Sequence, residues 1–327
     1  MQIGLLGAGR IGAIHGANIA AHSRVTLAAV ADADPNAAQR LAKTTGARVA
    51  SIESIIADKN IGAVFICTPT DMHADLIEKA AQAGKAVFCE KPVDLNSDRI
   101  RKCLDVVRAT NAKLMIGFNR RFDPSFASIR KRIGAGEIGK VELVTILSRD
   151  PSPPPPSYVA RSGGLYRDMM IHDFDMARFL LGEEPVEVHA VGSCLVDPGI
   201  GQAGDVDTAA VLLKTASGKI AQISCSRRAT YGYDQRIEVH GSGGLLAAGN
   251  RHATTVTRAD SKGYVSDPAL PFFLERYAEA YRAELDAFVA GVLDSASIAP
   301  NGEDGLRAQL LADAATRASQ TGQPQKV

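Results

Sequence analysis

The stretch from Gln2 to Gly12, with the sequence QIGLLGAGRIG, decides the fold of the first part of the chain. Its apolar start predicts a short strand, and a helical pattern follows the glycines to about residue 21. Gly7 permits a tight turn, Gly9 lets the backbone approach a pyrophosphate, and Gly12 lets the helix pack close to the strand. Because a strand precedes this GxGxxG motif and a helix follows it, the motif indicates a dinucleotide site at the helix N-terminus.

An acidic residue follows the second predicted strand. That strand covers residues 25–31 and leads into Asp32, about twenty residues past the last glycine of the motif, where the dinucleotide fold places an acid. The carboxylate would bind the ribose hydroxyls of the adenosine and repel a 2′-phosphate, so the sequence predicts NAD rather than NADP. The alternative is that Asp32 only begins the Asp-Ala-Asp-Pro turn.

Strand and helix patterns alternate through the rest of the first part of the chain. Strands are predicted at 63–67, 86–89 and 113–118, with helices at 71–84 and 97–109 between them. Such alternation is typical of a doubly wound parallel sheet (a Rossmann domain), in which ligands bind at the carboxyl ends of the strands. We therefore expect the residues after these strand ends to converge on one cleft. They are Thr68, Pro69, His73, Glu90, Lys91 and Asn119.

Lys91 stands between an acid and a proline, at a predicted strand end. This is an unusual place for a simple surface charge, and an amine there could stabilise negative charge on a reacting oxygen. The alternative is that Lys91 is a solvated surface lysine without a chemical role.

The pattern changes beyond residue 120. Strand-like runs at 141–149, 186–196, 205–213, 219–229 and 235–240 are separated by turn signals, which predicts a large, mostly antiparallel open sheet. The sequence therefore divides into a dinucleotide-binding domain, residues 1–120, and an α+β domain for substrate binding and oligomerisation, residues 121–327. We expect a helix at 165–181 to cover one face of this sheet and a contact between subunits to cover the other.

The run GGLYRDMMIHDFDMARFLLG, residues 163–182, is interpreted as one helix bounded by glycines. Met170 and Phe174 fall on one face of it, which we expect to be the core face. Asp168 and His172 lie four residues apart on another face, so the carboxylate could hold one ring nitrogen while the other takes a proton. The alternative is an amphipathic helix with a surface acid–histidine pair.

Composition excludes several classes of function. The 327 residues suit two domains, and the net charge is +1, with 37 basic and 36 acidic residues, so we expect neither a nucleic-acid surface nor a membrane surface. The five cysteines include no CxxC pair, which fits reduced thiols in a cytoplasmic protein. The seven histidines show no HExxH or HxH spacing, so no metal site is expected.

Several landmarks of the sequence resemble the glucose–fructose oxidoreductase / inositol dehydrogenase / MocA superfamily, over nearly the whole chain. They are GAGRIG at 7–12, the acid at 32, TPTDMH at 68–73, EKP at 90–92, GFNRRFDP at 117–124 and DMMIHDFDMARFLLGEEP at 168–185. Within that superfamily, the runs SRDPSPPP, SGGLYRDMMIHDFDMARFL and SRRATYGYDQRIEVHGSGG resemble the inositol 2-dehydrogenases of bacteria. The family often carries Met or Phe where Asn119 stands, so no fixed role is expected for Asn119.

The resemblance implies NAD-dependent oxidation of myo-inositol to 2-keto-myo-inositol (scyllo-inosose) by a homotetramer. It implies that Lys91, Asp168 and His172 form the catalytic set. The polyol site would be completed by Arg120, Asp150, Asp173 and Tyr231, with Tyr233 as the competing tyrosine of the same loop. The residues expected to bind NAD are Gly7, Gly9, Arg10, Ile11, Gly12, Asp32, Thr68, Pro69, His73, Glu90 and Lys91.

The expected mechanism divides the oxidation of an alcohol among the three catalytic side chains. His172 takes the hydroxyl proton as general base, Asp168 orients the imidazole, and Lys91 donates to the reacting oxygen. Three related activities remain open: a dehydrogenase for scyllo-inositol, one for a pyranose sugar, and an NAD-dependent glycosidase. The alternative of another class is a sensor that binds NAD or a sugar without chemistry, although a sensor would be expected to lose one of the three residues.

Overall fold

The computed structural model describes residues 1–327, apart from the side chain of Ala160. The chain divides into two compact units, and each unit is built from two separate stretches of sequence. The first unit contains residues 1–119 and 280–309, and the second contains residues 120–279 and 310–327. The contiguous division after residue 120 that we expect from the sequence therefore differs from the folded chain at residue 120 and in the segment 280–309.

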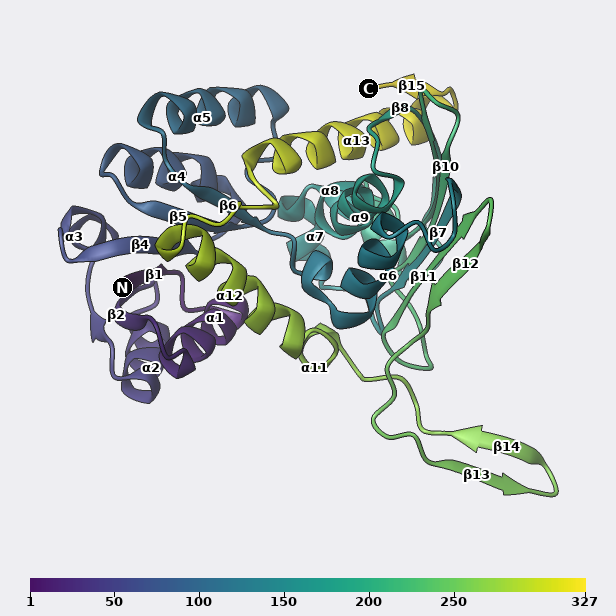
Figure 1. Ribbon diagram of the computed structural model, residues 1–327, viewed down its shortest axis with the longest axis horizontal. Coiled ribbons are helices and arrows are strands. Elements are labelled where there is room, and N and C mark those ends of the chain that lie inside the picture. Colours follow the sequence, from purple (N-terminus) through teal and green to yellow (C-terminus); the bar gives the residue numbers. More distant parts are fainter. The chain divides into compact units, whose positions relative to one another are not determined.

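A six-stranded parallel sheet forms the centre of the first unit, in the order β3-β2-β1-β4-β5-β6. Its strands are β1 (Gln2–Leu6), β2 (Thr26–Ala31), β3 (Arg48–Val49), β4 (Ile61–Ile66), β5 (Ala86–Glu90) and β6 (Leu114–Gly117), and the short helix α3 (Ile52–Ala57) precedes β4. Figure 1 shows α4 (His73–Gln82) and α5 (Ser97–Thr110) on one face of this sheet, and α1 (Arg10–Ala21), α2 (Pro35–Thr45) and α12 (Ala278–Leu293) on the other. The doubly wound parallel sheet predicted from the sequence is confirmed.

Helix α12 belongs with the first unit because its aromatic side chains complete the core of that unit. Phe65 on β4 and Phe88 on β5 stack with their ring centroids 4.4 Å apart. Phe288 on α12 meets the Phe65 ring edge-on at 5.1 Å, and Tyr281 meets the buried His15 ring at 5.6 Å. Burying these rings removes a large apolar surface from water, which explains why a segment distant in sequence returns to this sheet.

A seven-stranded sheet organises the second unit, in the order β12-β11-β7-β10-β9-β8-β15. Its strands are β7 (Val141–Arg149), β8 (Pro185–Ser193), β9 (Thr208–Thr215), β10 (Ile220–Ser226), β11 (Asp234–Gly241), β12 (Gly244–Ala248) and β15 (Gln325–Lys326). All neighbouring strands are antiparallel except β7 and β10, which run parallel. The mostly antiparallel sheet predicted for this part of the chain is confirmed.

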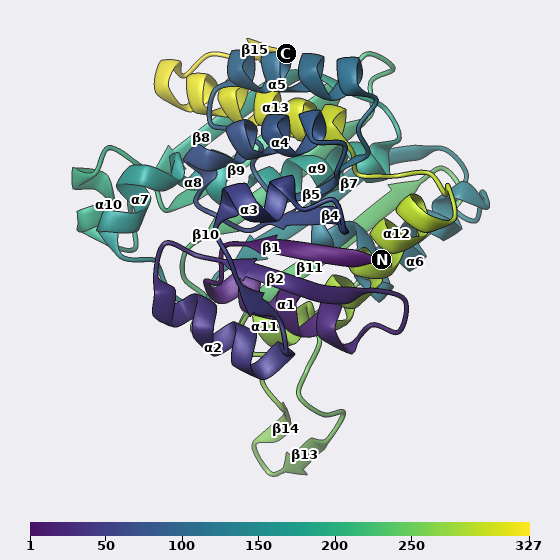
Figure 2. The ribbon, with the colours of Figure 1, turned by 90° about the vertical axis from the view of Figure 1, so that its left-hand side faces the viewer.

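The two faces of this sheet are unlike. Helices lie against one face, among them α6 (Pro124–Gly134), α8 (Gly164–Asp168) and α9 (Ile171–Leu181) (Figure 1). The short helix α7 (Pro156–Ser162) lies beside α8, and α10 (Pro198–Gln202) lies beside α7 (Figure 2). The unit also contains α11 (Phe273–Arg276) and the end of α13 (Gly302–Thr321). The strand alternation turns apolar side chains outward on the opposite face, and Val191, Leu212, Ile220 and Leu245 are 41–72% exposed there.

Residues 163–182 form two helices rather than one. The carbonyl oxygen of Leu165 accepts hydrogen bonds from the N–H groups of both Met169, at 3.1 Å, and Met170, at 2.9 Å. The second of these bonds spans five residues, and this wider turn interrupts the regular ladder of an α-helix. The prediction of a single helix over 165–181 is therefore wrong, because α8 ends before this turn and α9 begins after it.

The helix break changes how Asp168 and His172 are presented. Asp168 is the last residue of α8 and His172 is the second residue of α9, so one regular helical turn does not relate them. The expected core face of the segment is confirmed, because Met170 and Phe174 are completely buried. The helices that carry the two candidate catalytic groups are thus anchored by apolar packing on their other side.

A small hairpin projects from the rest of the second unit (Figures 1 and 2). It consists of β13 (Thr257–Asp260) and β14 (Gly263–Ser266), which pair antiparallel, and every residue of both strands is exposed. Tyr264 at its tip is 84% exposed. Across the part of the chain that the structure describes, no helix combines the length and apolar character needed to cross a bilayer.

Replacing Phe288 by Ala should destabilise the first unit. Removing a buried aromatic ring from a packed core costs about 3–5 kcal/mol, and Phe288 is completely buried beside Phe65 and Phe88. Urea unfolding followed by circular dichroism measures the loss. Arg282→Ala, at an exposed position of the same helix, is the matched control and should change stability by less than about 1 kcal/mol. Equal midpoints for Phe288→Ala and wild type would contradict the packing described for α12.

Candidate active site

The glycine-rich turn between β1 and α1 has the shape that a pyrophosphate requires. Gly7 has a φ of +99°, and a Cβ atom there would lie 2.4 Å from the carbonyl oxygen of Cys67. A Cβ atom on Gly12 would lie 1.9 Å from the carbonyl oxygen of Gly7. Around Gly9, by contrast, a Cβ atom would meet nothing within 4 Å, and Gly9 is exposed. The turn is therefore tight on its protein side and open where α1 begins, at Arg10.

The carboxylate of Asp32 ties the end of β2 to this turn. Its Oδ2 accepts a hydrogen bond from the N–H of Ala8 at 2.5 Å, and its Oδ1 accepts one from the N–H of Asp34 at 2.7 Å. The bond to Asp34 is the local side-chain contact that a turn residue makes, whereas the bond to Ala8 brings the carboxylate against the glycine loop. These contacts are compatible with binding of the adenosine ribose by Asp32 and equally with a role in the turn alone.

His73 joins the ends of two neighbouring strands. Its Nδ1 lies 2.7 Å from the carbonyl oxygen of Pro92, its Nε2 lies 2.8 Å from that of Thr68, and the residue is 1% exposed. Both ring nitrogens therefore lie within hydrogen-bonding distance of a backbone carbonyl oxygen. These contacts hold the Thr68–Pro69 loop after β4 next to the Lys91–Pro92 loop after β5. The expected convergence of strand ends is therefore present at this point of the sheet.

Lys91 follows a carboxylate that is held inside the first unit. Oε1 of Glu90 lies 2.7 Å from Nε2 of His15, and their side chains are 12% and 1% exposed. Lys91 is half-buried, and the peptide bond that joins it to Pro92 is cis. The backbone before Lys91 is thus anchored by the Glu90–His15 contact, and the backbone after it by the contact between Pro92 and His73.

Arg120 and Asp173 form a buried ion pair in the second unit. Nη1 of Arg120 lies 2.5 Å from Oδ1 of Asp173, and the side chains are 6% and 0% exposed. Arg120 also donates to Oγ of Ser148 at 3.3 Å, and its guanidinium carbon lies 5.8 Å from the centre of the Tyr277 ring. Burial raises the pKa of Asp173, and the Arg120 cation opposes the rise. Because an unpartnered buried charge is costly, Asp173 fixes the position of Arg120.

Asp150 follows β7 and lies in the electric field of two arginines. Burial raises the pKa of Asp150 to about 6, and the Arg227 and Arg120 cations oppose that rise. The carboxylates of Asp168 and Asp173 raise the same pKa further. A carboxyl group of this kind changes its protonation state just below neutral pH, so it can accept hydrogen bonds from hydroxyl groups or donate to them.

The two tyrosines before β11 have different surroundings. Tyr231 is 49% exposed, and its hydroxyl donates to Oδ2 of Asp234 at 2.7 Å and accepts from Nη1 of Arg149 at 3.0 Å. Tyr233 is 5% exposed and packs edge-on against Tyr277, with the ring centroids 6.0 Å apart. Tyr233 is therefore buried beside Tyr277, the ring that contacts Arg120 of the Arg120–Asp173 ion pair. Tyr231 is held at the protein surface, which forms the rim of the candidate site.

Asp168 has two partners from other elements of the second unit. Its carboxylate accepts a hydrogen bond from the hydroxyl of Tyr158 at 3.0 Å, and its Oδ2 lies 3.6 Å from Nη2 of Arg227. Burial and the charge of Asp168 together raise the pKa of Tyr158, so this tyrosine keeps its proton and remains a donor. Asp168 and His172 are both half-buried, which leaves each group some access from outside.

Sequence reasoning missed three residues that contact these groups: Tyr158, Arg227 and Ser148. Tyr158 lies on α7, directly after a run of prolines that indicates an extended loop. Arg227 directly follows β10, but the strand predicted at 219–229 runs through it and hides its place at a strand end. Lys91 was identified because it directly follows a strand. The same criterion identifies Arg227 once the strand is taken to end at Ser226. No sequence signal distinguishes Ser148 within β7.

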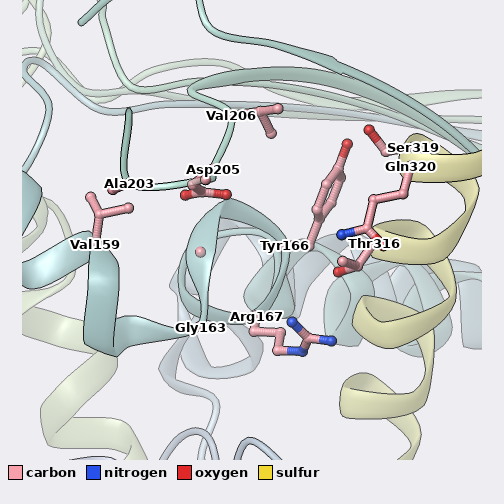
Figure 3. A pocket seen from close by; sticks show the side chains of 12 residues that line it. Val159, Gly163, Tyr166, Arg167, Ala203, Asp205, Val206, Thr316, Ser319 and Gln320 are labelled. Carbon is pink, nitrogen blue, oxygen red and sulfur yellow. The ribbon is translucent and has the colours of Figure 1, made fainter. Parts of the chain in front are cut away.

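A separate pocket opens beside α8 in the second unit (Figure 3). It has a volume of about 240 Å³, and its lining includes Gly163, Tyr166, Asp205, Val206, Thr316 and Ser319. Figure 3 shows Tyr166 and Ser319 facing this space from α8 and α13. The residues predicted for catalysis, for NAD and for the polyol do not line it.

Comparison with known proteins covers both parts of the chain. Residues 1–118 match the model of an oxidoreductase family with an NAD-binding Rossmann fold, and residues 126–247 match the model of the GFO/IDH/MocA C-terminal domain. Inositol 2-dehydrogenase from Rhizobium meliloti is 58% identical over 317 residues, which cover 97% of this chain and 96% of the relative.

Two solved structures extend this similarity to the fold. A myo-inositol dehydrogenase from Corynebacterium glutamicum superposes with a TM-score of 0.97 at 44% identity, covering 100% of this chain and 98% of the other. The scyllo-inositol dehydrogenase from Lactobacillus casei, with bound NAD(H) and scyllo-inositol, superposes with a TM-score of 0.93 at 32% identity, again covering 100% and 98%.

Substituting Gly9 and Gly12 by Ala should separate cofactor binding from folding. Gly9→Ala adds a methyl group in open space on the phosphate side, so it should weaken NAD binding about tenfold, or ~1.4 kcal/mol, without changing stability. Gly12→Ala forces its methyl group against Gly7 and should lower stability by about 1–3 kcal/mol. Calorimetric titration with NAD and urea unfolding measure the two effects. Unchanged NAD affinity in Gly9→Ala would contradict a pyrophosphate at this turn.

Proposed function

The chain belongs to the GFO/IDH/MocA family of oxidoreductases, and we propose that it oxidises myo-inositol to 2-keto-myo-inositol (scyllo-inosose) with NAD. The observation that carries this proposal is the identity with an inositol 2-dehydrogenase over nearly the full length of both chains. The polar cluster of the second unit, which we define as Arg120, Asp150, Asp173 and Tyr231, supports it, because a cyclic polyol needs many hydrogen-bonding partners. The arginine, carboxyl and tyrosine side chains of that cluster provide both donors and acceptors.

The glycine turn of the first unit fits NAD. The open side of Gly9 and the first turn of α1, which contains Arg10 and Ile11, would receive the pyrophosphate. Asp32 would accept hydrogen bonds from the ribose hydroxyls. The two loops that His73 joins, Thr68–Pro69 and Glu90–Lys91, would complete the cofactor site. Bound NAD supplies the acceptor for the hydride that leaves the alcohol carbon.

Three side chains would move the proton and stabilise charge during the oxidation. His172 accepts the proton of the reacting hydroxyl as general base, because an imidazole takes up and releases protons near neutral pH. Asp168 orients this imidazole and stabilises the imidazolium that forms. Lys91 donates a hydrogen bond to the reacting oxygen, which stabilises the negative charge that develops as the proton leaves.

The other hydroxyl groups of the ring would meet the buried polar cluster. Arg120, whose direction is set by Asp173, supplies donors, and Asp150 accepts or donates because its pKa is about 6. Tyr231 is the tyrosine proposed to contact the polyol from the rim, and the more buried Tyr233 is the alternative. An analogue that lacks a hydroxyl would leave one of these groups unpaired, so the site should discriminate against deoxy substrates.

The purified protein should reduce NAD when it is given myo-inositol, and His172→Ala should lower kcat by about 10²–10⁴-fold because the general base is lost. NADH absorbance measures both. His252→Ala, at an exposed histidine, is the matched control and should retain the wild-type rate. Near wild-type turnover by His172→Ala would show that another group takes the proton.

A substrate panel in the same assay separates the rival activities. The value of kcat/KM should be higher for myo-inositol than for scyllo-inositol or D-glucose, each measured separately. Scyllo-inositol is the second candidate, because the Lactobacillus casei enzyme that was crystallised with it has the same fold as this chain. A sensor would bind NAD and a polyol without releasing NADH, and a glycosidase would turn over without net NADH.

We also propose that the chain assembles as a homotetramer through the open face of the seven-stranded sheet. Val191 and Leu212, on neighbouring strands of that face, are 72% and 48% exposed. Apolar side chains gathered on a flat surface are typical of an interface between subunits. A cytoplasmic location is part of the proposal, and it is supported by five cysteines that are all free thiols.

Charges placed on this face should dissociate the assembly. In the double variant Val191→Glu/Leu212→Glu, two carboxylates would have to be desolvated, so the mass measured by light scattering should fall toward that of one chain, 34.5 kDa. Tyr264→Glu, on the projecting hairpin, should leave the mass unchanged. A wild-type protein with the mass of a single chain, or a double variant that stays tetrameric, would refute this interface.

A further inference from the structure

Arg227 is a buried cation of the second unit that lies beside a proposed catalytic carboxylate. It directly follows β10, it is 1% exposed, and it is among the largest fully buried side chains of the chain. Its Nη2 lies 3.6 Å from Oδ2 of Asp168 and 4.0 Å from Oδ2 of Asp205. Removing a guanidinium from water is costly unless nearby negative charge compensates it, so these carboxylates and Arg227 depend on one another.

The backbone at Arg227 is fixed independently of its side chain. The N–H of Arg227 donates to the carbonyl oxygen of Asp207 at 2.8 Å. The buried carboxylate of Asp207 in turn accepts hydrogen bonds from the N–H groups of Leu195, Val196 and Asp197. The backbone of Arg227 is therefore anchored to the connection between β8 and β9, which fixes the point from which its side chain extends.

One cation serves acids from three different elements. Arg227 lies beside Asp168 at the end of α8 and beside Asp205, which precedes β9. Burial raises the pKa of Asp150, which follows β7, and Arg227 is the charge that opposes this rise most. The hydroxyl of Tyr158 donates to the same Asp168 carboxylate at 3.0 Å, so Arg227 and Tyr158 approach it as a cation and a neutral donor.

We propose that Arg227 is a positioning residue for the oxidation: with Tyr158, it holds the Asp168 carboxylate in the orientation from which Asp168 supports His172. This inference rests on the proposed function and deepens it. Arg227 acts through Asp168 rather than on the substrate, because its charged end lies against that carboxylate. Loss of Arg227 should therefore affect turnover more than substrate binding.

The kinetic test compares Arg227→Met with Arg228→Met, which removes the same charge from the exposed neighbouring residue. Arg227→Met should lower kcat with myo-inositol about 10–100-fold and change KM less than about threefold, whereas Arg228→Met should match wild type. Arg227→Gln replaces the Met variant if the latter does not fold. Turnover by the Arg227 variant within twofold of wild type, about the spread expected of the control, would overturn the proposal.

The pH dependence of kcat supplies a readout that a purely structural role would not move. The titratable groups facing Arg227 are Asp150, Asp168, Asp205, Tyr158 and Cys225. The Arg227 cation lowers the pKa of Asp150 and of Asp205, so its loss should raise both and move the acid limb of kcat to higher pH by about one unit. Arg227→Lys keeps a cation and should bring the limb back. If the acid limb of Arg227→Lys lies at the same pH as that of Arg227→Met, the charge of Arg227 has no role.

A third measurement needs no activity. In a double-mutant cycle of urea unfolding at neutral pH, Arg227→Met and Asp168→Asn should be coupled by at least about tenfold in the unfolding equilibrium constant. A coupling factor near one would overturn the anchoring of Asp168 by Arg227. A wild-type protein that shows this coupling but releases no NADH from inositol would refute the proposed function and leave the anchoring supported.

Discussion

The burial of charge is the constraint on which the second unit depends. An ionised side chain that leaves water must find a compensating partner, and this unit buries the guanidinium groups of Arg120, Arg227 and Arg276. Arg120 is paired with Asp173, and Arg276 is paired with Asp123, the N-cap residue of α6. Each pair joins segments that are far apart in sequence. Charge pairing therefore fixes how the helices are seated over the sheet and where the acids of the candidate site stand.

Much of the fold could be predicted from the sequence, because parallel strands that are buried on both faces leave continuous apolar runs between helical patterns. Two features could not be predicted. The break between α8 and α9 depends on the hydrogen bonds of Met169 and Met170 to Leu165, and methionine is a good helix former that gives no warning of a break. The placement of α12 depends on which aromatic core receives Phe288, and that choice is made by tertiary packing.

The sequence predicted that loops at the strand ends meet, but it did not predict the side-chain contacts between them. Strand ends correctly indicated that the loops at Thr68 and Lys91 lie together, but the sequence does not reveal that the His73 ring is the link between them. Likewise, Asp173 was expected to face a polyol, whereas its carboxylate is buried against Arg120. Side-chain partners of this kind are set by neighbours from distant elements, so residue type and spacing alone do not determine them.

The return of α12 to the first unit has a consequence for biosynthesis. A ribosome produces the chain from its N-terminus, so the parallel sheet and its glycine turn emerge long before residues 280–309 do. Until then, the aromatic surface of Phe65 and Phe88 lacks the helix that covers it. The nucleotide-binding unit therefore cannot complete its aromatic core until residues 280–309 have been made, and it carries uncovered apolar rings during most of translation.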